Sequence, residues 1–332
     1  MKVLITGGAG FIGSHLAERY LKEGCSVSII DDLSTGSIDN IAHLKGMPGF
    51  HYTIGSVFSA STVAEWVDWS DVVFHMAAAV GVRLVVDSPV KTIETNVHGT
   101  EVVLNASAKK GKRVIIASTS EVYGKSNKFP FSEDADLVLG PSNAGRWSYA
   151  CSKALDEFLA IAYHVEKRVP ITVVRLFNTV GPRQTARYGM VLPRFVRQAL
   201  ANEPITVYGD GSQSRCFSYV LDVVEALVRI AQSEKTIGEI INIGNDQEIS
   251  INELAKVVCI RLQSQSNVIH MSYEEAYGLG FEDMARRVPS LAKLESIIGY
   301  RPTTPLLTII DAVAEEMRAR LSEPTLKSNA NS

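Results

Sequence analysis

Cysteine is scarce in this sequence, and its four cysteines are too far apart to form a disulfide framework or a metal-binding motif. They stand at Cys25, Cys151, Cys216 and Cys259, with no CxxC pair among them. This spacing is typical of reduced cysteines in a cytosolic protein, so we expect no metal centre.

Long apolar runs and an excess of basic residues are also missing. No apolar segment is long enough to span a membrane, and the strand-like run Val3-Leu4-Ile5 follows the first residues without the layout of a signal peptide. The net charge is −3, with acidic and basic residues interspersed. This pattern argues against a nucleic-acid partner and against binding to a membrane surface. We therefore expect a cytoplasmic protein.

The sequence does contain a glycine-rich turn between a strand and a helix. Residues 6–13 read TGGAGFIG, and a helix is expected from about Ser14 to Leu21. Glycines in this spacing let the backbone turn tightly and approach a pyrophosphate, which the helix N-terminus then faces. The cofactor-binding candidates in this turn are Gly7, Gly10, Phe11, Ile12 and Gly13.

A second strand, at residues 26–30, ends at Asp31. An acid in this place can hydrogen-bond the ribose hydroxyls of an adenosine and repel a 2′-phosphate. Asp31 therefore favours NAD over NADP as the cofactor.

Strand-like runs recur at residues 72–75, 113–117 and 171–175, with helix-length segments between them. This alternation predicts an α/β fold with a doubly wound parallel sheet of the Rossmann type. Ligands bind such sheets at the carboxyl ends of the strands, so Ala77 and Ala78 should lie at the cofactor. We interpret His75 as a packed, hydrogen-bonded strand-end residue and not as a catalyst.

The stretch from Ser118 to Lys153 carries the candidate chemistry. Tyr149 and Lys153 are four positions apart, so they share one face of a helix and the ammonium can sit beside the phenol. A phenol ionises near pH ~10, and a nearby cation stabilises the phenolate that would serve as a base near neutrality. The alternative is an ordinary surface pair.

Two helices, at residues 90–109 and 149–166, carry apolar residues along much of their length. A helix that is apolar on more than one face needs a second partner. Association into a homodimer through these helices and deep packing within one chain both satisfy this pattern, and we leave the two open.

We divide the chain into an NAD-binding domain at residues 1–176, with returning segments at about 217–245, and a smaller mixed α/β substrate domain at residues 177–321. A helix at residues 251–263 begins after Ser250, where Glu253 completes a capping box. Residues 322–332 are polar and are expected to form a flexible tail.

Several motifs together resemble the extended short-chain dehydrogenase/reductase family that modifies nucleotide sugars. They are TGGAGFIGS, the strand end at Asp31, HMAAA, ETNVHGT with Asn96, STSEVYG, YACSK and RLFNTVGPR. The resemblance implies a tightly held NAD and a nucleotide-sugar substrate. It also implies that Thr119 and Tyr149 contact the sugar near its 4-hydroxyl, that Lys153 binds the nicotinamide ribose, and that Asn178 lies beside the diphosphate.

Within this family, the residues after the threonine resemble those of bacterial UDP-glucuronic acid decarboxylases. The chain has Ser120-Glu121 there, where 4,6-dehydratases usually have Asp-Glu and epimerases have small hydroxyl residues. The stretches 139–149, 211–217, 277–283 and 287–290 agree with the decarboxylases. The resemblance implies that Ser120 lies in the catalytic site, and that Glu121 and Arg215 handle the proton and charge at carbon 5.

Alternative roles stay open for several of these residues. Glu121 would otherwise cap a helix, and Arg215 would suit a diphosphate equally well. Arg183 and Arg287 are candidates for a phosphate clamp, with a solvated surface role open for Arg183. Val207, in a short strand at 205–208, completes the list of substrate-binding candidates.

The sequence departs from the family at residues 54–57, which read IGSV where an aspartate usually recognises the adenine amino group. Ser56 can still form a hydrogen bond, although a neutral group binds less strongly. Ser56 and Val57 are therefore retained as cofactor-binding candidates.

The expected activity is decarboxylation of UDP-glucuronate through a 4-keto intermediate, giving UDP-xylose or a UDP-4-keto-pentose. The alternative is a 4-epimerase acting on UDP-glucose or UDP-glucuronate with the same Thr119, Tyr149 and Lys153. A 4,6-dehydratase and a non-catalytic NAD sensor are less favoured.

Overall fold

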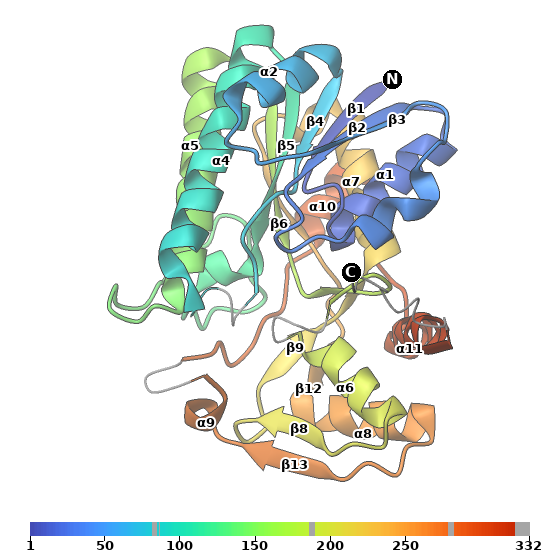
Figure 1. The fold of residues 1–332 in the computed structure, drawn as a ribbon. Coiled ribbons are helices and arrows are strands. Elements are labelled where there is room, and N and C mark those ends of the chain that lie inside the picture. Colours follow the sequence, from blue (N-terminus) through green and yellow to red (C-terminus); the bar gives the residue numbers. More distant parts are fainter. Residues whose placement is uncertain (82–84, 86, 186–189, 278–281, 323–332) are drawn as a thin grey trace, which may run out of the picture.

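The computed structural model describes residues 1–81, 85, 87–185, 190–277 and 282–322, and a seven-stranded parallel sheet is its largest element (Figure 1). The strands follow the order β11-β6-β5-β4-β1-β2-β3. Their bounds are Lys2–Thr6 for β1, Ser26–Asp31 for β2, Phe50–Ile54 for β3, Val72–His75 for β4, Arg113–Thr119 for β5, Ile171–Leu176 for β6 and Ile240–Ile243 for β11. The doubly wound sheet expected from the alternating pattern is confirmed.

Helices cover both faces of this sheet, as parallel strands require. One face carries α2 (Ala60–Trp69), α4 (Pro89–Lys110) and α5 (Trp147–Lys167) (Figure 1). The other carries α1 (Phe11–Lys22), α7 (Val220–Gln232) and α10 (Ala292–Ile298). Two apolar cores fill these layers, and Leu16, Tyr20 and Val223 lie in one while Val67, Val103 and Tyr163 lie in the other.

Packing within the chain accounts for part of the apolar surface of α4 and α5, and the homodimer stays a prediction. The two helices pack against each other, and Val102, Val103 and Leu104 of α4 are buried within the chain. Leu155 and Phe158 of α5 are 50% and 70% exposed. An apolar strip therefore remains on the outside of the helix pair.

The smaller part of the chain lies below the carboxyl ends of the strands in Figure 1. It contains α6 (Val191–Leu200), β8 (Ile205–Tyr208), β9 (Ser214–Cys216), β12 (Glu248–Ser250), α8 (Ile251–Leu262), β13 (Val268–Met271) and α9 (Tyr273–Tyr277). At the start of α8, Ser250 and Glu253 form the expected capping box.

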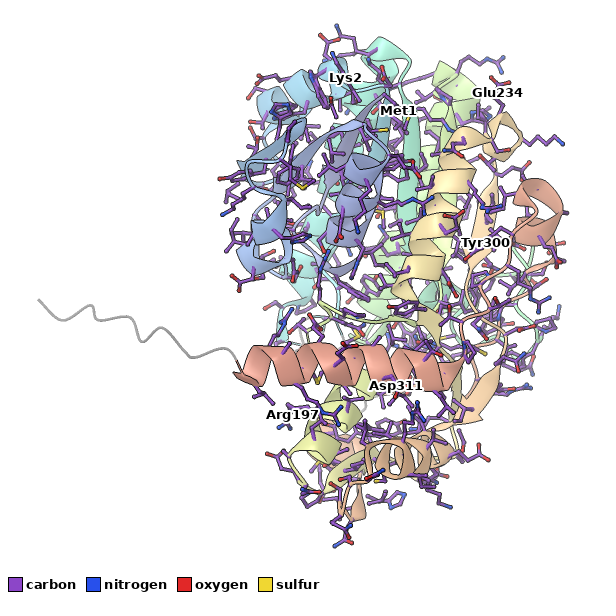
Figure 2. The ribbon with its side chains drawn as sticks, turned by 90° about the vertical axis from the view of Figure 1, so that its right-hand side faces the viewer. Met1, Lys2, Arg197, Glu234, Tyr300 and Asp311 are labelled. Carbon is purple, nitrogen blue, oxygen red and sulfur yellow. The ribbon has the colours of Figure 1, made fainter. Side chains whose placement is uncertain are left out.

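The long helix α11 (Leu306–Ser322) runs across the junction between the two parts, as Figure 2 shows. Its buried residues Ile309, Ile310 and Val313 join the core of the smaller part. On its exposed side, Asp311 accepts two hydrogen bonds from Arg261 of α8, at 2.7 and 2.5 Å.

Short connecting elements complete the described chain. They are the 3-10 helices η1 (Ile38–Leu44), η2 (Ser120–Tyr123) and η3 (Glu234–Thr236), and the two-residue strands β7 (Thr179–Val180) and β10 (Ser218–Tyr219). Within the described residues, none of the helices has the length and apolar character needed to cross a membrane. The expected tail falls almost entirely at 323–332, outside the described residues.

Candidate functional site

A cavity runs along the glycine turn at the carboxyl edge of the sheet. Its lining includes all five glycine-turn candidates together with Asp31, Ala77, Ala78, Tyr149 and Lys153. A β-carbon at Gly7, where φ is +72°, would come within 2.7 Å of the Ala77 amide nitrogen. Only glycine fits there, so the turn stays bare and its backbone faces the cavity.

Asp31 holds the turn in shape from the end of β2. Its Oδ2 accepts a hydrogen bond from the Ala9 amide at 2.9 Å, and its Oδ1 accepts one from the Leu33 amide at 2.8 Å. Burial raises the pKa of this carboxyl, while the backbone hydrogen bonds act to lower it. The cavity, the bare glycine backbone and an acid beside them fit a dinucleotide with free ribose hydroxyls.

Three cofactor-binding candidates lie outside this lining. The Ser56 hydroxyl accepts a hydrogen bond from the Phe58 amide, and Val57 is buried. The Asn96 side chain accepts from the Ala79 amide at 2.9 Å and donates to Ser152 at 3.0 Å. Asn96 therefore supports the cavity wall from behind.

His75 is packed as expected. It is 1% exposed, and its ring nitrogens lie 2.8 Å from the Thr6 hydroxyl and 3.1 Å from the Thr100 hydroxyl. Burial, with a smaller contribution from the charge of Lys153, lowers its pKa to about 3. The imidazole is therefore neutral near pH 7, and both of its nitrogens are occupied by threonine hydroxyls.

A second cavity adjoins the first, and the two share Glu121, Tyr149, Asn178 and Arg287 in their linings. Tyr149 comes from the first turns of α5, and Glu121 from η2 at the end of β5. Burial raises the pKa of the Tyr149 phenol, and the negative charge of Glu121 raises it further. A hydrogen bond with Thr119 and the charge of Arg146 act in the opposite direction.

Glu121 is held by two arginines. Its carboxylate accepts from Arg146 Nη1 at 2.5 Å and from Arg287 Nη1 at 3.2 Å. Burial acts to raise the pKa of Glu121, but the two guanidinium charges outweigh it and the pKa is lowered. The lowered pKa favours the ionised carboxylate near pH 7, and the carboxylate oxygens contact two guanidinium groups.

The cluster continues through Asp283. This carboxylate accepts from Arg215 Nη2 at 2.7 Å and lies 3.4 Å from Arg287 Nη2. Burial, followed by the charge of Arg287, lowers the pKa of Arg215 to about 10. The five side chains Glu121, Asp283, Arg146, Arg215 and Arg287 thus bring three positive and two negative charges to one buried place, which favours an anionic ligand.

The substrate-binding candidates divide into two groups. Asn178, Arg215 and Arg287 line the second cavity. Arg183 instead pairs with Glu18 of α1 at 2.5 Å and lies outside both linings.

The Val207 side chain does not line the second cavity, and its role as a substrate contact stays a prediction. Side chains alternate along β8, so Val207 is fully buried in the core of the smaller part and the next residue, Tyr208, lines the cavity.

Sequence reasoning missed Arg146 and Asp283, which line the second cavity and belong to the charge cluster. Arg146 stands three positions before Tyr149 at the start of α5, a spacing that places both on one helix face and would have served as a signal. Asp283 belongs to the 277–283 motif. Residues 278–281 of that motif lie outside the described residues. Arg194, Gln213 and Tyr273 line the second cavity as well.

Comparisons with known proteins agree with this geometry. Residues 3–244 match the model of the NAD dependent epimerase/dehydratase family. The chain is 44% identical over 302 residues to the UDP-N-acetyl-alpha-D-glucosaminuronate decarboxylase of Bacillus cytotoxicus, covering 91% of this chain and 92% of that one. It is 34% identical over 321 residues to UDP-glucuronic acid decarboxylase 2 of Arabidopsis thaliana, covering 97% of this chain and 69% of the relative.

A solved structure also matches over almost the whole chain. It is the UDP-glucuronic acid 4-epimerase of Bacillus cereus in complex with UDP-glucuronic acid and NAD. The TM-score is 0.87 at 28% identity, covering 96% of this chain and 100% of the other.

Proposed function

The chain belongs to the NAD-dependent epimerase/dehydratase family, and on that premise we propose that it decarboxylates a UDP-linked hexuronic acid through a 4-keto intermediate. The observation that carries this proposal is the buried cluster of three arginines and two acids beside Tyr149. Its excess positive charge suits a substrate with a carboxylate on the sugar.

Residues along the glycine turn would hold NAD, with Asp31 at the adenosine ribose and Lys153 at the nicotinamide ribose. When bound, NAD supplies a hydride acceptor at carbon 4 and later returns the hydride. Tyr149, as phenolate, takes the proton of the sugar 4-hydroxyl. Thr119, which forms a hydrogen bond with Tyr149, and Ser120, which lines the same cavity, orient the groups around it. The sugar becomes a 4-ketone.

A ketone at carbon 4 and a carboxylate on carbon 5 together form a β-keto acid. The bond between carbon 5 and the carboxyl carbon breaks, carbon dioxide leaves, and the electron pair remains as an enolate across carbons 4 and 5. Nearby guanidinium groups of Arg215 and Arg287 stabilise that negative charge. Carbon 5 then takes a proton, and return of the hydride with the Tyr149 proton gives the pentose.

Glu121 is the candidate proton donor at carbon 5, although the two arginines keep it ionised in this structure. A substrate carboxylate that enters the cluster adds a negative charge and competes for Arg146 and Arg287. Both effects raise the pKa of Glu121, so that it can carry a proton when carbon 5 needs one.

The sugar carries either a hydroxyl or an acetamido group at carbon 2. The relative that is 44% identical is named for the N-acetylated sugar, and those at 34% for UDP-glucuronate. The test is to incubate the purified protein and NAD with each of the two sugars and to follow carbon dioxide and product mass. Loss of the carboxyl mass supports the proposal, and the faster sugar identifies the substrate.

A 4-epimerase is the second candidate, because the Bacillus cereus 4-epimerase shares the fold over 96% of this chain and the reaction would need the same Thr119, Tyr149 and Lys153. In the same assay it would give an unchanged mass and a new stereoisomer. That outcome would overturn the decarboxylase proposal.

A homodimer through α4 and α5 is also part of the proposal. Val90 and Ile93 of α4, and Leu155, Phe158 and Val165 of α5, are between 43% and 70% exposed. A second copy of the helix pair would cover this apolar strip. We also propose a cytoplasmic location, since the cysteines are free and Cys151 is exposed, which suits a reducing compartment.

A further inference from the structure

A buried ion pair on α5 lies just outside the arginine cluster. Lys153 Nζ donates to Asp156 Oδ2 at 2.7 Å, and the two side chains are 2% and 0% exposed. Lys153 also lines the cavity along the glycine turn, whereas Asp156 does not. A buried ammonium needs a counter-charge, and here the partner stands behind the lysine on the same helix.

The surroundings of Asp156 are polar and ordered. Burial raises the pKa of Asp156, while Lys153 and the Thr100 hydroxyl of α4 act to lower it. The Thr100 hydroxyl also lies 3.1 Å from His75 Nε2. His75 Nδ1 in turn lies 2.8 Å from the hydroxyl of Thr6 on β1. Polar contacts therefore connect the strand before the glycine turn with the counterion of Lys153.

Among the described acids, Asp156 is the one that forms an ion pair with Lys153. Glu157, the next residue, is occupied by Arg175 of β6, which donates to both of its oxygens, and by the Ser118 hydroxyl. The neutral ring of His75 carries no charge. Asp156 is thus the carboxylate that balances Lys153.

We propose that Asp156 is a positioning residue, which holds the Lys153 ammonium between Tyr149 and the cofactor cavity. Its negative charge also offsets part of the positive charge near the Tyr149 phenol. An ammonium has three N–H donors. One is directed to Asp156, and Lys153 lines the cavity, where another N–H can serve the cofactor. The inference rests on the proposed function only in using the same Tyr149 and Lys153, and it applies equally to a 4-epimerase.

The charge of Asp156 has a calculable direction of effect on Tyr149. Burial and the charge of Glu121 raise the pKa of the phenol, and the charge of Asp156 raises it further. Thr119 and Arg146 lower it. Removal of the Asp156 charge alone therefore favours the phenolate and moves the acidic limb of the rate profile to lower pH.

Two variants separate position from charge. Asp156→Asn keeps an oxygen that can accept from Lys153 but removes the charge. Asp156→Leu removes both. Asp68→Asn is the control, because Asp68 forms an exposed ion pair with Lys110 at 2.8 Å, far from the site.

The readouts are NAD affinity by calorimetry and the pH profile of product formation, each from about pH 6 to pH 9. We expect Asp156→Leu to weaken NAD binding about tenfold, equivalent to one lost charge-assisted contact. We expect Asp156→Asn to bind NAD within about threefold of wild type and to shift the acidic limb down by about one pH unit, which is about tenfold in rate on that limb.

Wild-type NAD affinity in Asp156→Leu would overturn the proposal, and so would an unmoved acidic limb in Asp156→Asn. Equal losses in both variants would overturn it too, since that pattern indicates a packing defect. If wild-type protein turns over neither sugar, the proposed function fails, whereas the calorimetry still decides the role of Asp156.

Discussion

Replacement of Glu121 by glutamine tests the buried charge cluster directly. Glutamine has nearly the same shape, but the cluster then holds three positive charges against one negative charge. Removal of one partner from a buried ion pair destabilises a protein by about 3–5 kcal/mol. The glutamine oxygen can still accept from Arg146, so we expect a loss somewhat below this range, about 2–3 kcal/mol.

The catalytic effect should be larger than the effect on stability. If Glu121 protonates carbon 5, its loss should reduce carbon dioxide release by roughly 10²- to 10⁴-fold. The assay is trapping of carbon dioxide from a carboxyl-labelled sugar nucleotide, combined with denaturant unfolding of the same preparation.

Glu203→Gln is the matched control. Glu203 pairs with Arg197 at 2.8 Å, but both side chains are about half exposed, at 50% and 51%. The same substitution should change the free energy of unfolding by less than about 1 kcal/mol, because exposed pairs contribute little. Wild-type carbon dioxide release in Glu121→Gln, or a stability loss no greater than in the control, would refute our reasoning.

The stability difference should also depend on pH. The pKa of Glu121 in the folded protein lies below its ordinary value of 4.5. The folded state therefore gains stability from this carboxylate above about pH 4.5, and loses it as pH falls through the folded pKa. The difference between wild type and Glu121→Gln should stay constant from neutrality to about pH 5 and shrink below that.

Three further predictions concern the phenol, the cofactor and the apolar strip. Tyr149→Phe should lower turnover roughly 10²- to 10⁴-fold while NAD affinity, measured by calorimetry, stays near wild type; wild-type turnover would favour a non-catalytic NAD sensor. Asp31→Asn should weaken NAD binding about tenfold and narrow the preference over NADP in the same calorimeter, because repulsion of a 2′-phosphate is lost; an unchanged preference would contradict its role. Phe158→Glu should convert a dimer into a monomer by light scattering, whereas Leu221→Glu, at a 48% exposed position on α7, should not; a dimer that survives Phe158→Glu would exclude this interface.

Local patterns were sufficient to predict the sheet. The strands identified from the sequence are short apolar runs separated by helix-length segments, so their parallel direction follows from the alternation. The order of the strands in the sheet, and β3 with its polar residues, were not predicted. The packing of His75 was predictable because a histidine at a strand end is more often packed and hydrogen-bonded than catalytic.

The arginine cluster was beyond sequence reasoning as a unit. Arg146 and Glu121 are close in sequence to Tyr149, but Arg215, Asp283 and Arg287 reach the site only through the folding of the smaller part. Arg287 stays a phosphate-clamp candidate, and its contact with Glu121 could not be read from the sequence. The sequence also did not show that the Tyr208 side chain, and not that of Val207, faces the cavity, because the orientation of a strand decides which of its alternating side chains do so.

The split origin of this cluster constrains how the chain can be recombined. Glu121 and Arg146 come from the sheet half and pair with each other, whereas Arg287, the second partner of Glu121, and Asp283, which pairs with Arg287, come from the last third of the sequence. A chimaera that takes its C-terminal half from a relative would combine acidic and basic residues that were not selected together. Its buried cluster would then carry an unbalanced charge. Gene fusions in this family should therefore tolerate crossovers only where both charge sets are inherited from one parent.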